Sequence, residues 1–429
     1  MNVTRRARAC AVAIGLVSGL VGRASAQRAD GALTIDAAVR EAIDHNLTLI
    51  AERYSVSVAD ARIVTAGLRP NPVVTVSTLL PSTELFDNGV SPREEIAHVD
   101  VPIERGGKRE YRLDVARAAK SVAELQLMNT VRQLALDVQS ACVDVVQAKQ
   151  NLALARESLD AFNALVQINT ERVRTGDLSQ VELSRSRLAA LQFQNDVRQQ
   201  QAKLTVAQGR LRTLLGRIDA APIEVDDNLR RDSAAVDRDA VQRLAIAQRP
   251  DLEALRRDQA RSTADLRLQE AQGKVDFTLS GEFHHQYQPL PAPAGAGGAL
   301  YGLFLSSPLP LFNRNQGEIA RAQLEEKQTT ARIAAYEAQV RTEVDAAYEA
   351  YTAARDVVST IEAQMLARAR DVRSATEYSY RRGEASFVEF LDAVRAFNDT
   401  MQSYNAARAD YARSLYTLDA SAGGAGVHP

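Results

Sequence analysis

The hydrophobic pattern of the chain is dominated by two long seams in which apolar residues recur at alternating steps of four and three. The first seam, polar only at its last position, consists of Leu127, Val131, Leu134, Val138, Ala141, Val145, Ala148, Leu152, Ala155, Leu159, Phe162, Val166 and Asn169. The second, interrupted once by arginine, consists of Val340, Val344, Ala347, Tyr351, Ala354, Val358, Ile361, Met365, Arg368, Val372 and Ala375. Seams of this length are typical of coiled coils, because the spacing keeps one apolar stripe facing a partner helix.

Proline, the strongest helix breaker, is absent from both seams. None occurs between Pro102 and Pro222 or between Pro310 and Pro429. At about 1.5 Å per residue, helices over 107–176 and 317–383 would each run roughly 100 Å, which no compact domain accommodates. Helices over 178–215 and 239–272 together nearly match that length, so we expect them to stack end to end as the returning path.

Each long helix ends at a similar polar turn. The two copies align position by position as Arg174, Gly176, Asp177, Ser179 and Glu182 in the first, and Arg381, Gly383, Glu384, Ser386 and Glu389 in the second. The glycine suits the left-handed end of one helix, the arginine suits its C-terminal dipole, and Ser-x-x-Glu predicts a capping box for the next helix. The pattern predicts two tight turns, each at the end of a coiled-coil hairpin.

Strands are predicted upstream of each long helix, at about 72–80 and 95–103 and at about 275–287 and 299–309. In the third strand Val275, Phe277, Leu279, Phe283 and Tyr287 alternate with polar residues, and Val99 and Val101 alternate with His98 and Asp100 in the second. If the strands cross a membrane, Val275, Phe277, Leu279, Val99 and Val101 face lipid. Four strands cannot close a transmembrane barrel, so this interpretation requires several copies, and three would give twelve strands. Soluble hairpins on a helical core are the alternative.

The fold class is therefore mainly α with a small β part and an internal two-fold repeat. We divide the chain into a signal peptide (1–26), a first repeat (27–216), an equatorial connector (217–238), a second repeat (239–421) and a disordered tail (422–429). The signal peptide is indicated by basic residues before an apolar run too short to span a membrane, followed by Ala24-Ser25-Ala26. Cys10 lies within it, too early to be a lipidated first residue, so we expect no lipid anchor and no disulfide.

Composition narrows the possible functions. The 429 residues are 45% hydrophobic with a formal net charge of −2, and the cationic residues are dispersed, so nucleic acid is not an expected partner. Five histidines without a cluster of ligand spacing argue against an enzyme, a cofactor or a metal site. His284 and His285 are adjacent on a predicted strand, so they point to opposite faces and cannot chelate one ion as regular strand neighbours.

The chain resembles the TolC family of outer-membrane efflux channels over nearly its whole mature length. The resemblance rests on the tandem repeat, both turns, and the segments "GLRPNPVVTVS" and "PLPLFNRNQGEIARAQ", while "ERGGKRE" at 104–110 resembles the CzcC-type branch associated with heavy-metal cation efflux. It implies a homotrimer with a twelve-stranded β-barrel in the outer membrane and a periplasmic α-barrel of long helices. It also implies an adaptor protein, an inner-membrane pump of RND type, and both turns as the periplasmic tip that docks the adaptor.

Other interpretations stay open. Asp177 and Glu384, repeated around a narrow tip, could form a cation-selective ring, although capping and dipole chemistry also account for acidic residues there. A pore-less periplasmic coiled-coil protein with a structural or interaction role shares every feature except the membrane strands. The transported substrate is open, and the "ERGGKRE" resemblance slightly favours metal cations.

Overall fold

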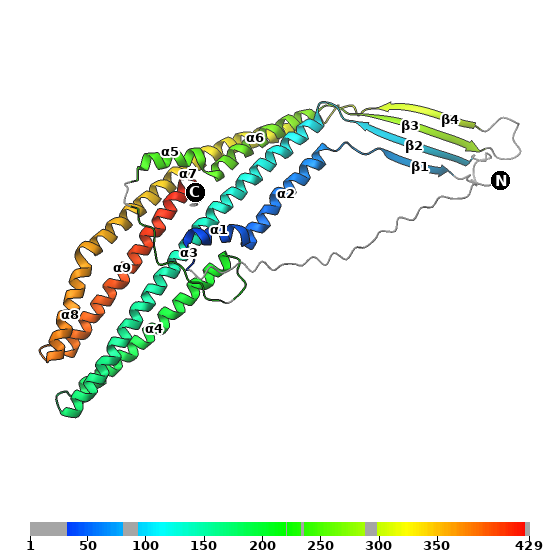
Figure 1. Ribbon diagram of the computed structural model, residues 1–429. Coiled ribbons are helices and arrows are strands. Elements are labelled where there is room, and N and C mark those ends of the chain that lie inside the picture. Colours follow the sequence, from blue (N-terminus) through cyan, green and yellow to red (C-terminus); the bar gives the residue numbers. More distant parts are fainter. Residues whose placement is uncertain (1–31, 80–92, 220, 233–235, 288–297, 425–429) are drawn as a thin grey trace, which may run out of the picture.

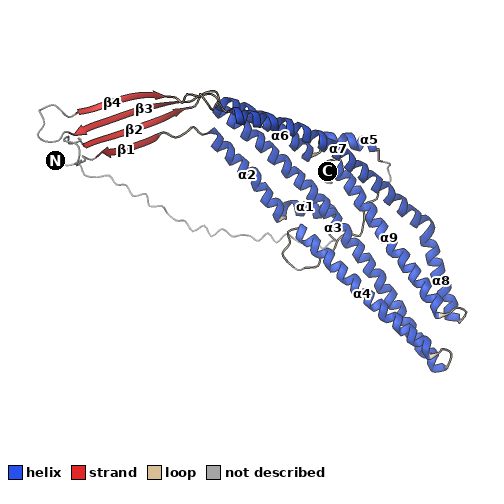
Figure 2. Cartoon of the chain, turned by 180° about the vertical axis from the view of Figure 1, so that it is seen from behind, coloured by secondary structure: helices blue, strands red, loops and turns tan. Residues whose placement is uncertain are grey.

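The computed structural model describes residues 32–79, 93–219, 221–232, 236–287 and 298–424 as an elongated, mostly helical molecule. The strands lie at one end and the helix turns at the other (Figures 1 and 2). The elements in chain order are α1 (Ile35–His45), α2 (Leu47–Gly67), β1 (Val73–Leu79), β2 (Arg93–Ile103), α3 (Lys108–Thr175), α4 (Gln180–Leu214), α5 (Arg238–Gln248), α6 (Pro250–Gln272), β3 (Phe277–Tyr287), β4 (Gly298–Ser306), α7 (Gln316–Thr360), a π-helical turn (Ile361–Met365), α8 (Leu366–Arg382) and α9 (Phe387–Ser421). The segment predicted as a signal peptide lies outside the described residues.

The long helices form a single curved layer with two free edges. Near the strands the order across the layer is α2, α3, α6 and α7, and near the turns it is α4, α3, α9 and α8. Among the described helices, α2 and α4 therefore lie at one edge of the layer and α7 and α8 at the other, with α5 also packed on α7. Apolar side chains are exposed on the four edge helices, among them Tyr54 on α2, Leu188 on α4, Leu324 on α7 and Val372 on α8.

The four strands form one antiparallel sheet in the order β1-β2-β3-β4. β2 and β3 pair along their full lengths, with Val99 opposite Gly281 and Val101 opposite Leu279. Of the described strands, β1 and β4 are the outer ones, and each has one unpaired edge. The sheet therefore ends in two open edges, as the helical layer does. The sheet continues the helical layer, so both parts form one open wall.

The first helix of each half is broken in two, whereas the helix over 239–272 was expected to be continuous. In the first half Asn46 ends α1 and caps α2, because its Oδ1 accepts a hydrogen bond from Leu49 N. In the second half Arg249 and Pro250 separate α5 from α6. The helix predicted over 239–272 is therefore wrong at this point, because Pro250 occupies the first position of a new helix, where its missing N–H costs nothing.

The second hydrophobic seam also differs from the sequence prediction. A π-helical turn inserts one extra residue at Ile361–Met365, so the packed stripe continues through the half-buried Leu366, Ala369, Arg373 and Thr376 to the buried Tyr380. Of the predicted seam positions from the end of the turn onward, Met365 is 43% exposed and Val372 54% exposed. The odd arginine of the predicted seam, Arg368, is exposed and lies outside it. The first seam is confirmed, with Val138, Ala141, Val145 and Leu152 buried.

The connector between the halves crosses the middle of the helical layer. Its residues Ile223 and Val225 are buried, and Leu33 bridges Val225 in parallel. Farther along, Arg231 makes a bidentate ion pair with Glu362 in the π-helical turn. At the chain end Gly423 adopts φ +97° and Gly424 N donates to Asp419 O, so the first residues of the expected disordered tail are ordered. No described helix is both long enough and apolar enough to span a membrane.

Candidate functional site

The two helix turns are built on glycines that share one backbone conformation. Gly176 has φ +87° and Gly383 has φ +80°, the left-handed region that favours glycine. The turns close by the same hydrogen bonds, from Asp177 N to Arg172 O (2.8 Å) and from Glu384 N to Ser379 O (2.8 Å). The internal repeat therefore extends from the sequence to the backbone geometry of the turns.

The helices that leave the turns are capped by the predicted serines, although only one capping box is complete. Ser386 Oγ accepts from Glu389 N (3.3 Å), and Glu389 Oε2 accepts from Ser386 N (2.7 Å). Ser179 Oγ accepts from Glu182 N (3.2 Å), but the reciprocal bond does not form, so the predicted first box is only half made. The bond from Ser386 N is the main reason that the pKa of Glu389 lies below its usual range.

The charged side chains of the turns mostly pair within their own turn. Arg174 pairs with Glu171 (2.7 Å) and Arg381 with Glu377 (2.5 Å), each on the helix that carries it. Among the described residues, the carboxylate of Asp177 accepts from a neutral donor, Thr175 Oγ1 (2.6 Å). Except for the half-buried Glu377, these groups are exposed, so the turns present fixed charges to solvent.

An aromatic cluster beneath the turns holds the two hairpins together. Phe162 of α3, Phe387 and Phe390 of α9 and Tyr380 of α8 are buried against one another. Tyr380 Oη donates to Asn169 Oδ1 (3.1 Å), and both residues are buried. This bond explains why the apolar first seam ends at an asparagine, whose partner on the other hairpin the sequence does not reveal.

Beside each turn the surface is open and partly apolar. Val181 and Val388 occupy equivalent positions and are 61% and 48% exposed. No atom lies within 4 Å of where a Cβ would stand on Gly176, so a partner could approach the backbone there. The sequence analysis left these valines out of the candidate site, although they align in the two copies of the turn motif.

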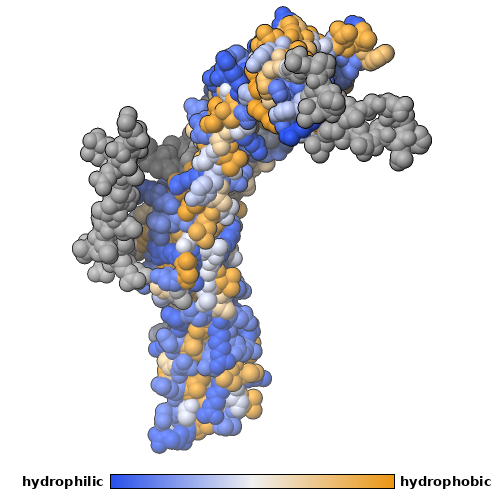
Figure 3. Space-filling view, turned by 90° about the vertical axis from the view of Figure 1, so that its right-hand side faces the viewer, coloured by the Kyte–Doolittle hydropathy of each residue, from blue (hydrophilic) through white to orange (hydrophobic). Residues whose placement is uncertain are grey.

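The sheet has one apolar and one polar face. Val99, Val101, Leu279 and Phe283 share a face on which their side chains are exposed. Hydrophobic side chains gather over this end of the molecule in Figure 3, above a helical part that is mostly hydrophilic. Val275 precedes β3, which begins at Phe277, so its assignment to the strand is wrong.

The opposite face of the sheet carries the polar side chains. Ser280 is buried and donates to Asp100 Oδ1 (2.5 Å), so it is not the free polar position that the alternation suggests. His284 lies on this face beside Glu94 (3.2 Å), whereas His285 lies on the other face against Tyr287. The two adjacent histidines therefore point apart, as the sequence analysis expects.

The segment "ERGGKRE" clamps the helices to the strands. Lys108 Nζ donates to Asp276 Oδ2 (2.7 Å), Arg109 Nε donates to Gly67 O (2.6 Å), and Arg112 forms a bidentate ion pair with Glu104. The hydrogen bond from Arg112 is the main reason that the pKa of Glu104 is lowered. These bonds thus join the three connections from α2 to β1, from β2 to α3 and from α6 to β3 where the helices meet the sheet.

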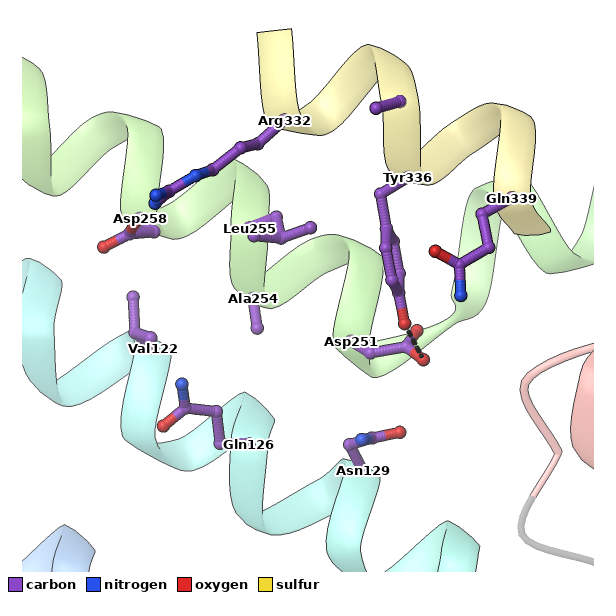
Figure 4. Close-up of a pocket in the computed structure, with 11 residues that line it drawn as sticks. Val122, Gln126, Asn129, Asp251, Ala254, Leu255, Asp258, Arg332, Tyr336 and Gln339 are labelled. Carbon is purple, nitrogen blue, oxygen red and sulfur yellow. Dashed lines mark hydrogen bonds between the residues drawn. The ribbon is translucent and has the colours of Figure 1, made fainter. Parts of the chain in front are cut away.

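A cavity of about 570 Å³ lies over α6 between α3 and α7 (Figure 4). The carboxylate of Asp251 at the bottom of the cavity is already engaged in hydrogen bonds. It accepts from Tyr336 Oη (2.9 Å), Arg249 (2.7 Å) and Arg132 (3.1 Å). Burial would raise the pKa of Asp251, but the hydrogen bond from Arg249 and the nearby cations lower it overall. Such a paired carboxylate is poorly suited to proton transfer.

Within the described parts of the chain, no three His, Cys, Asp or Glu side chains are grouped so that they could hold a metal ion. Cys142 is buried, and desolvation raises the pKa of its thiol to about 12, so it does not act as a nucleophile.

The chain is similar to proteins of one kind over nearly all its length. A family model described as outer membrane efflux protein matches residues 38–217 and 241–424. The cobalt-zinc-cadmium resistance protein CzcC of Cupriavidus metallidurans is 24% identical over 377 residues, which cover 86% of this chain and 85% of that protein.

Solved structures share the fold. CusC superimposes with a TM-score of 0.75 at 18% identity, covering 91% of this chain and 92% of that one. VceC of Vibrio cholerae superimposes with a TM-score of 0.71 at 16% identity, covering 92% and 97%.

Proposed function

Because this chain belongs to the outer membrane efflux protein family, we propose that three copies of it close into one channel that exports metal cations and docks an adaptor by its helix turns. The family assignment gives the general function: the chain is the outer-membrane channel of a tripartite efflux system and works with an adaptor and an inner-membrane pump. It is a passive conduit, not an enzyme, with its helical part in the periplasm. The pore-less alternative is thereby set aside.

The observation that carries the trimer is the open wall formed by the sheet and the helical layer. A sheet exposed to lipid on one face must close on itself, because unpaired strand edges are not tolerated in a bilayer. With an even number of strands per chain, β4 of one copy can pair antiparallel with β1 of the next, and three copies give twelve strands. The edge helices would meet in the same way, covering apolar residues such as Tyr54 and Leu324.

The mass of the purified mature protein in detergent, followed by planar-bilayer recording, tests this proposal. A trimer that conducts supports it, and a monomer or dimer that never inserts overturns it. Leu279→Arg on the apolar face should block assembly, because arginine on the lipid-facing side of a barrel strand is destabilising. Thr278→Arg, one residue away on the polar face, is the matched control and should be tolerated. Equal tolerance would count against lipid on the apolar face.

The division into repeats proposed from the sequence fits this assembly, with residues 27–216 and 239–421 each supplying one hairpin of strands and one helix turn. In a trimer, two turns per chain would give six similar docking sites at the periplasmic tip. We place these sites at Arg174, Gly176, Asp177, Ser179 and Glu182 and at Arg381, Gly383, Glu384, Ser386 and Glu389. The exposed Val181 and Val388 supply the apolar contact beside each glycine.

Metal cations are the proposed cargo because the relative CzcC is named for cobalt, zinc and cadmium resistance. The test is growth of the source cells, with this chain deleted, on Co²⁺, Zn²⁺ and Cd²⁺. Re-expression should restore metal resistance, and restored drug resistance alone would overturn the metal assignment.

The same assay tests docking. V181D/V388D should abolish the restored resistance without changing trimer assembly, whereas Ile218→Asp, in the connector, should leave resistance intact. Full resistance in V181D/V388D would argue against docking at the turns.

A cation-selective ring at the tip rests more on Asp177 than on Glu384. Glu384 is paired with Arg382 (3.2 Å), which offsets its charge, while the partner of Asp177 within the described chain is a hydroxyl. In a trimer the Asp177 carboxylates would repeat around the tip, where acidic rings favour cations.

A further inference from the structure

Two histidines on the polar face of the sheet lie beside carboxylates, within β2 and across the β2–β3 pair. His98 Nε2 is 2.7 Å from Asp100 Oδ1, and His98 Nδ1 is 3.4 Å from Glu282 Oε2. Farther along the strands His284 Nε2 is 3.2 Å from Glu94 Oε2. We call these five residues the histidine–carboxylate ladder.

The remaining neighbours of the ladder are uncharged. Ser280 Oγ donates to Asp100, and Gln286 Nε2 donates to Glu94 Oε1 (3.0 Å). On the flanking strands Thr75 of β1 lies opposite His98, while Gly302 and Leu300 of β4 lie opposite Glu282 and His284. Among the described strand residues, the charge of this region of the polar face is therefore set by the ladder.

The geometry around His98 favours its protonated form. A carboxylate can only accept hydrogen bonds, and an imidazole donates from both ring nitrogens only when it is protonated. Histidine ordinarily titrates between about pH 5 and pH 8, whereas paired carboxylates stay ionised there. Loss of the imidazole protons over this range would leave the same carboxylates with less compensating positive charge.

We propose that the histidine–carboxylate ladder makes the cation preference of the channel depend on pH. The inference rests on the proposed function, in which the polar face lines the lumen of the barrel. Protonated histidines partly offset Glu94, Asp100 and Glu282, so the lumen is less negative at low pH. Deprotonation makes it more negative, and a negative lumen concentrates small cations.

Reversal potentials across planar bilayers, with the mature protein in a KCl gradient at about pH 5.5 and about pH 8, test this proposal. The ratio of K⁺ to Cl⁻ permeability in the wild type should rise about twofold between these pH values. In H98N/H284N the ratio should be high at both. His285→Asn is the matched control, because His285 is the next residue of β3 and lies on the opposite face, and it should behave as the wild type.

Unchanged pH dependence in H98N/H284N, or none in the wild type, would overturn the proposal. If H98N/H284N does not assemble, D100N/E282Q supplies a second test. It should lower the cation preference at both pH values, and a wild-type ratio in it would also overturn the proposal. Failure of every chain, wild type included, to conduct would instead contradict the proposed channel.

Discussion

Lys108 Nζ donates a 2.7 Å hydrogen bond to Asp276 Oδ2, joining the first residue of α3 to the residue just before β3. Asp276 Oδ1 also accepts from Arg105 N (2.8 Å), so one carboxylate links the two halves of the chain where helices meet strands. The Lys108 side chain is only 9% exposed. An ammonium so nearly buried depends on its partner.

Asp276→Ala should therefore lower the free energy of unfolding by about 2 kcal/mol, because it leaves a nearly buried ammonium without its charged acceptor. Chemical unfolding in detergent, followed by helical circular dichroism, measures the loss. Adding Lys108→Met should recover part of it, since no unpaired charge then stays buried. A stable D276A variant would show that this contact does not tie the junction.

Replacing a turn glycine by alanine should lower the stability of the protein, whereas replacing a glycine inside a helix should raise it. Gly176→Ala and Gly383→Ala should each destabilise the protein by about 1 kcal/mol, because both positions have positive φ. Gly209→Ala should stabilise it by about 0.5 kcal/mol, since Gly209 lies within α4 with no atom within 4 Å of an added Cβ. Chemical unfolding of the three variants tests this, and equal effects would contradict the assigned turn geometry.

Cys142 should not react with a maleimide in the folded protein at about pH 8. Its side chain is buried and its thiol pKa is raised to about 12 by desolvation, so the thiolate is scarce and inaccessible. Labelling should become complete in denaturant, as mass spectrometry would show. Asp160→Cys, exposed on the same helix, is the positive control, and labelling of folded Cys142 would place it outside the core.

The capping box at Ser386 should make the turn sensitive to acid. Because the folded pKa of Glu389 lies below its ordinary value of 4.5, its contribution is present above that value and lost as pH falls through the lowered one. The difference in thermal midpoint between the wild type and Glu389→Gln should shrink below about pH 4. Glu182→Gln should show little difference at any pH, because its box is incomplete. A gap for E389Q that stays constant with pH would contradict this role.

Asp177→Asn should reduce the cation selectivity of the assembled channel more than Glu384→Gln does. The reason is that Arg382 already offsets Glu384, whereas Asp177 contacts a neutral hydroxyl. Reversal potentials at fixed pH measure this. Unchanged selectivity in D177N/E384Q would end the ring hypothesis and leave these residues with helix-end chemistry alone.

The sequence predicted elements whose signals are local. The long helix that ends at Gly176, the two turns and the four strands follow from periodicity and glycine placement, and the structure has all of them. The break at Pro250 had a visible signal that the expected helix length overrode. The break at Asn46 had a weaker sequence signal. Asn46 Nδ2 donates to Leu214 O, and a contact so distant in sequence is not visible in the local pattern.

The one-residue shift of the second seam at the π-helical turn could not be predicted from periodicity. Alternating steps fit both the predicted positions and those shifted by one, and Met365 and Val372 are as apolar as a seam requires. What selects the shifted stripe is tertiary: Tyr380 reaches Asn169, and Glu362 is held by Arg231 and by Tyr404 Oη (2.8 Å). Arg368 in the predicted seam was the one local sign of the slip.

The two free edges of the wall also bear on genetics. In a closed trimer each copy contacts both of the others through its two edges. One copy with a defective edge would therefore leave an intact neighbour without its partner surface. When intact and defective chains are made together, most rings would contain at least one defective copy. A substitution at an edge residue such as Tyr54 would then act dominantly, whereas one that prevents the chain from folding would act recessively.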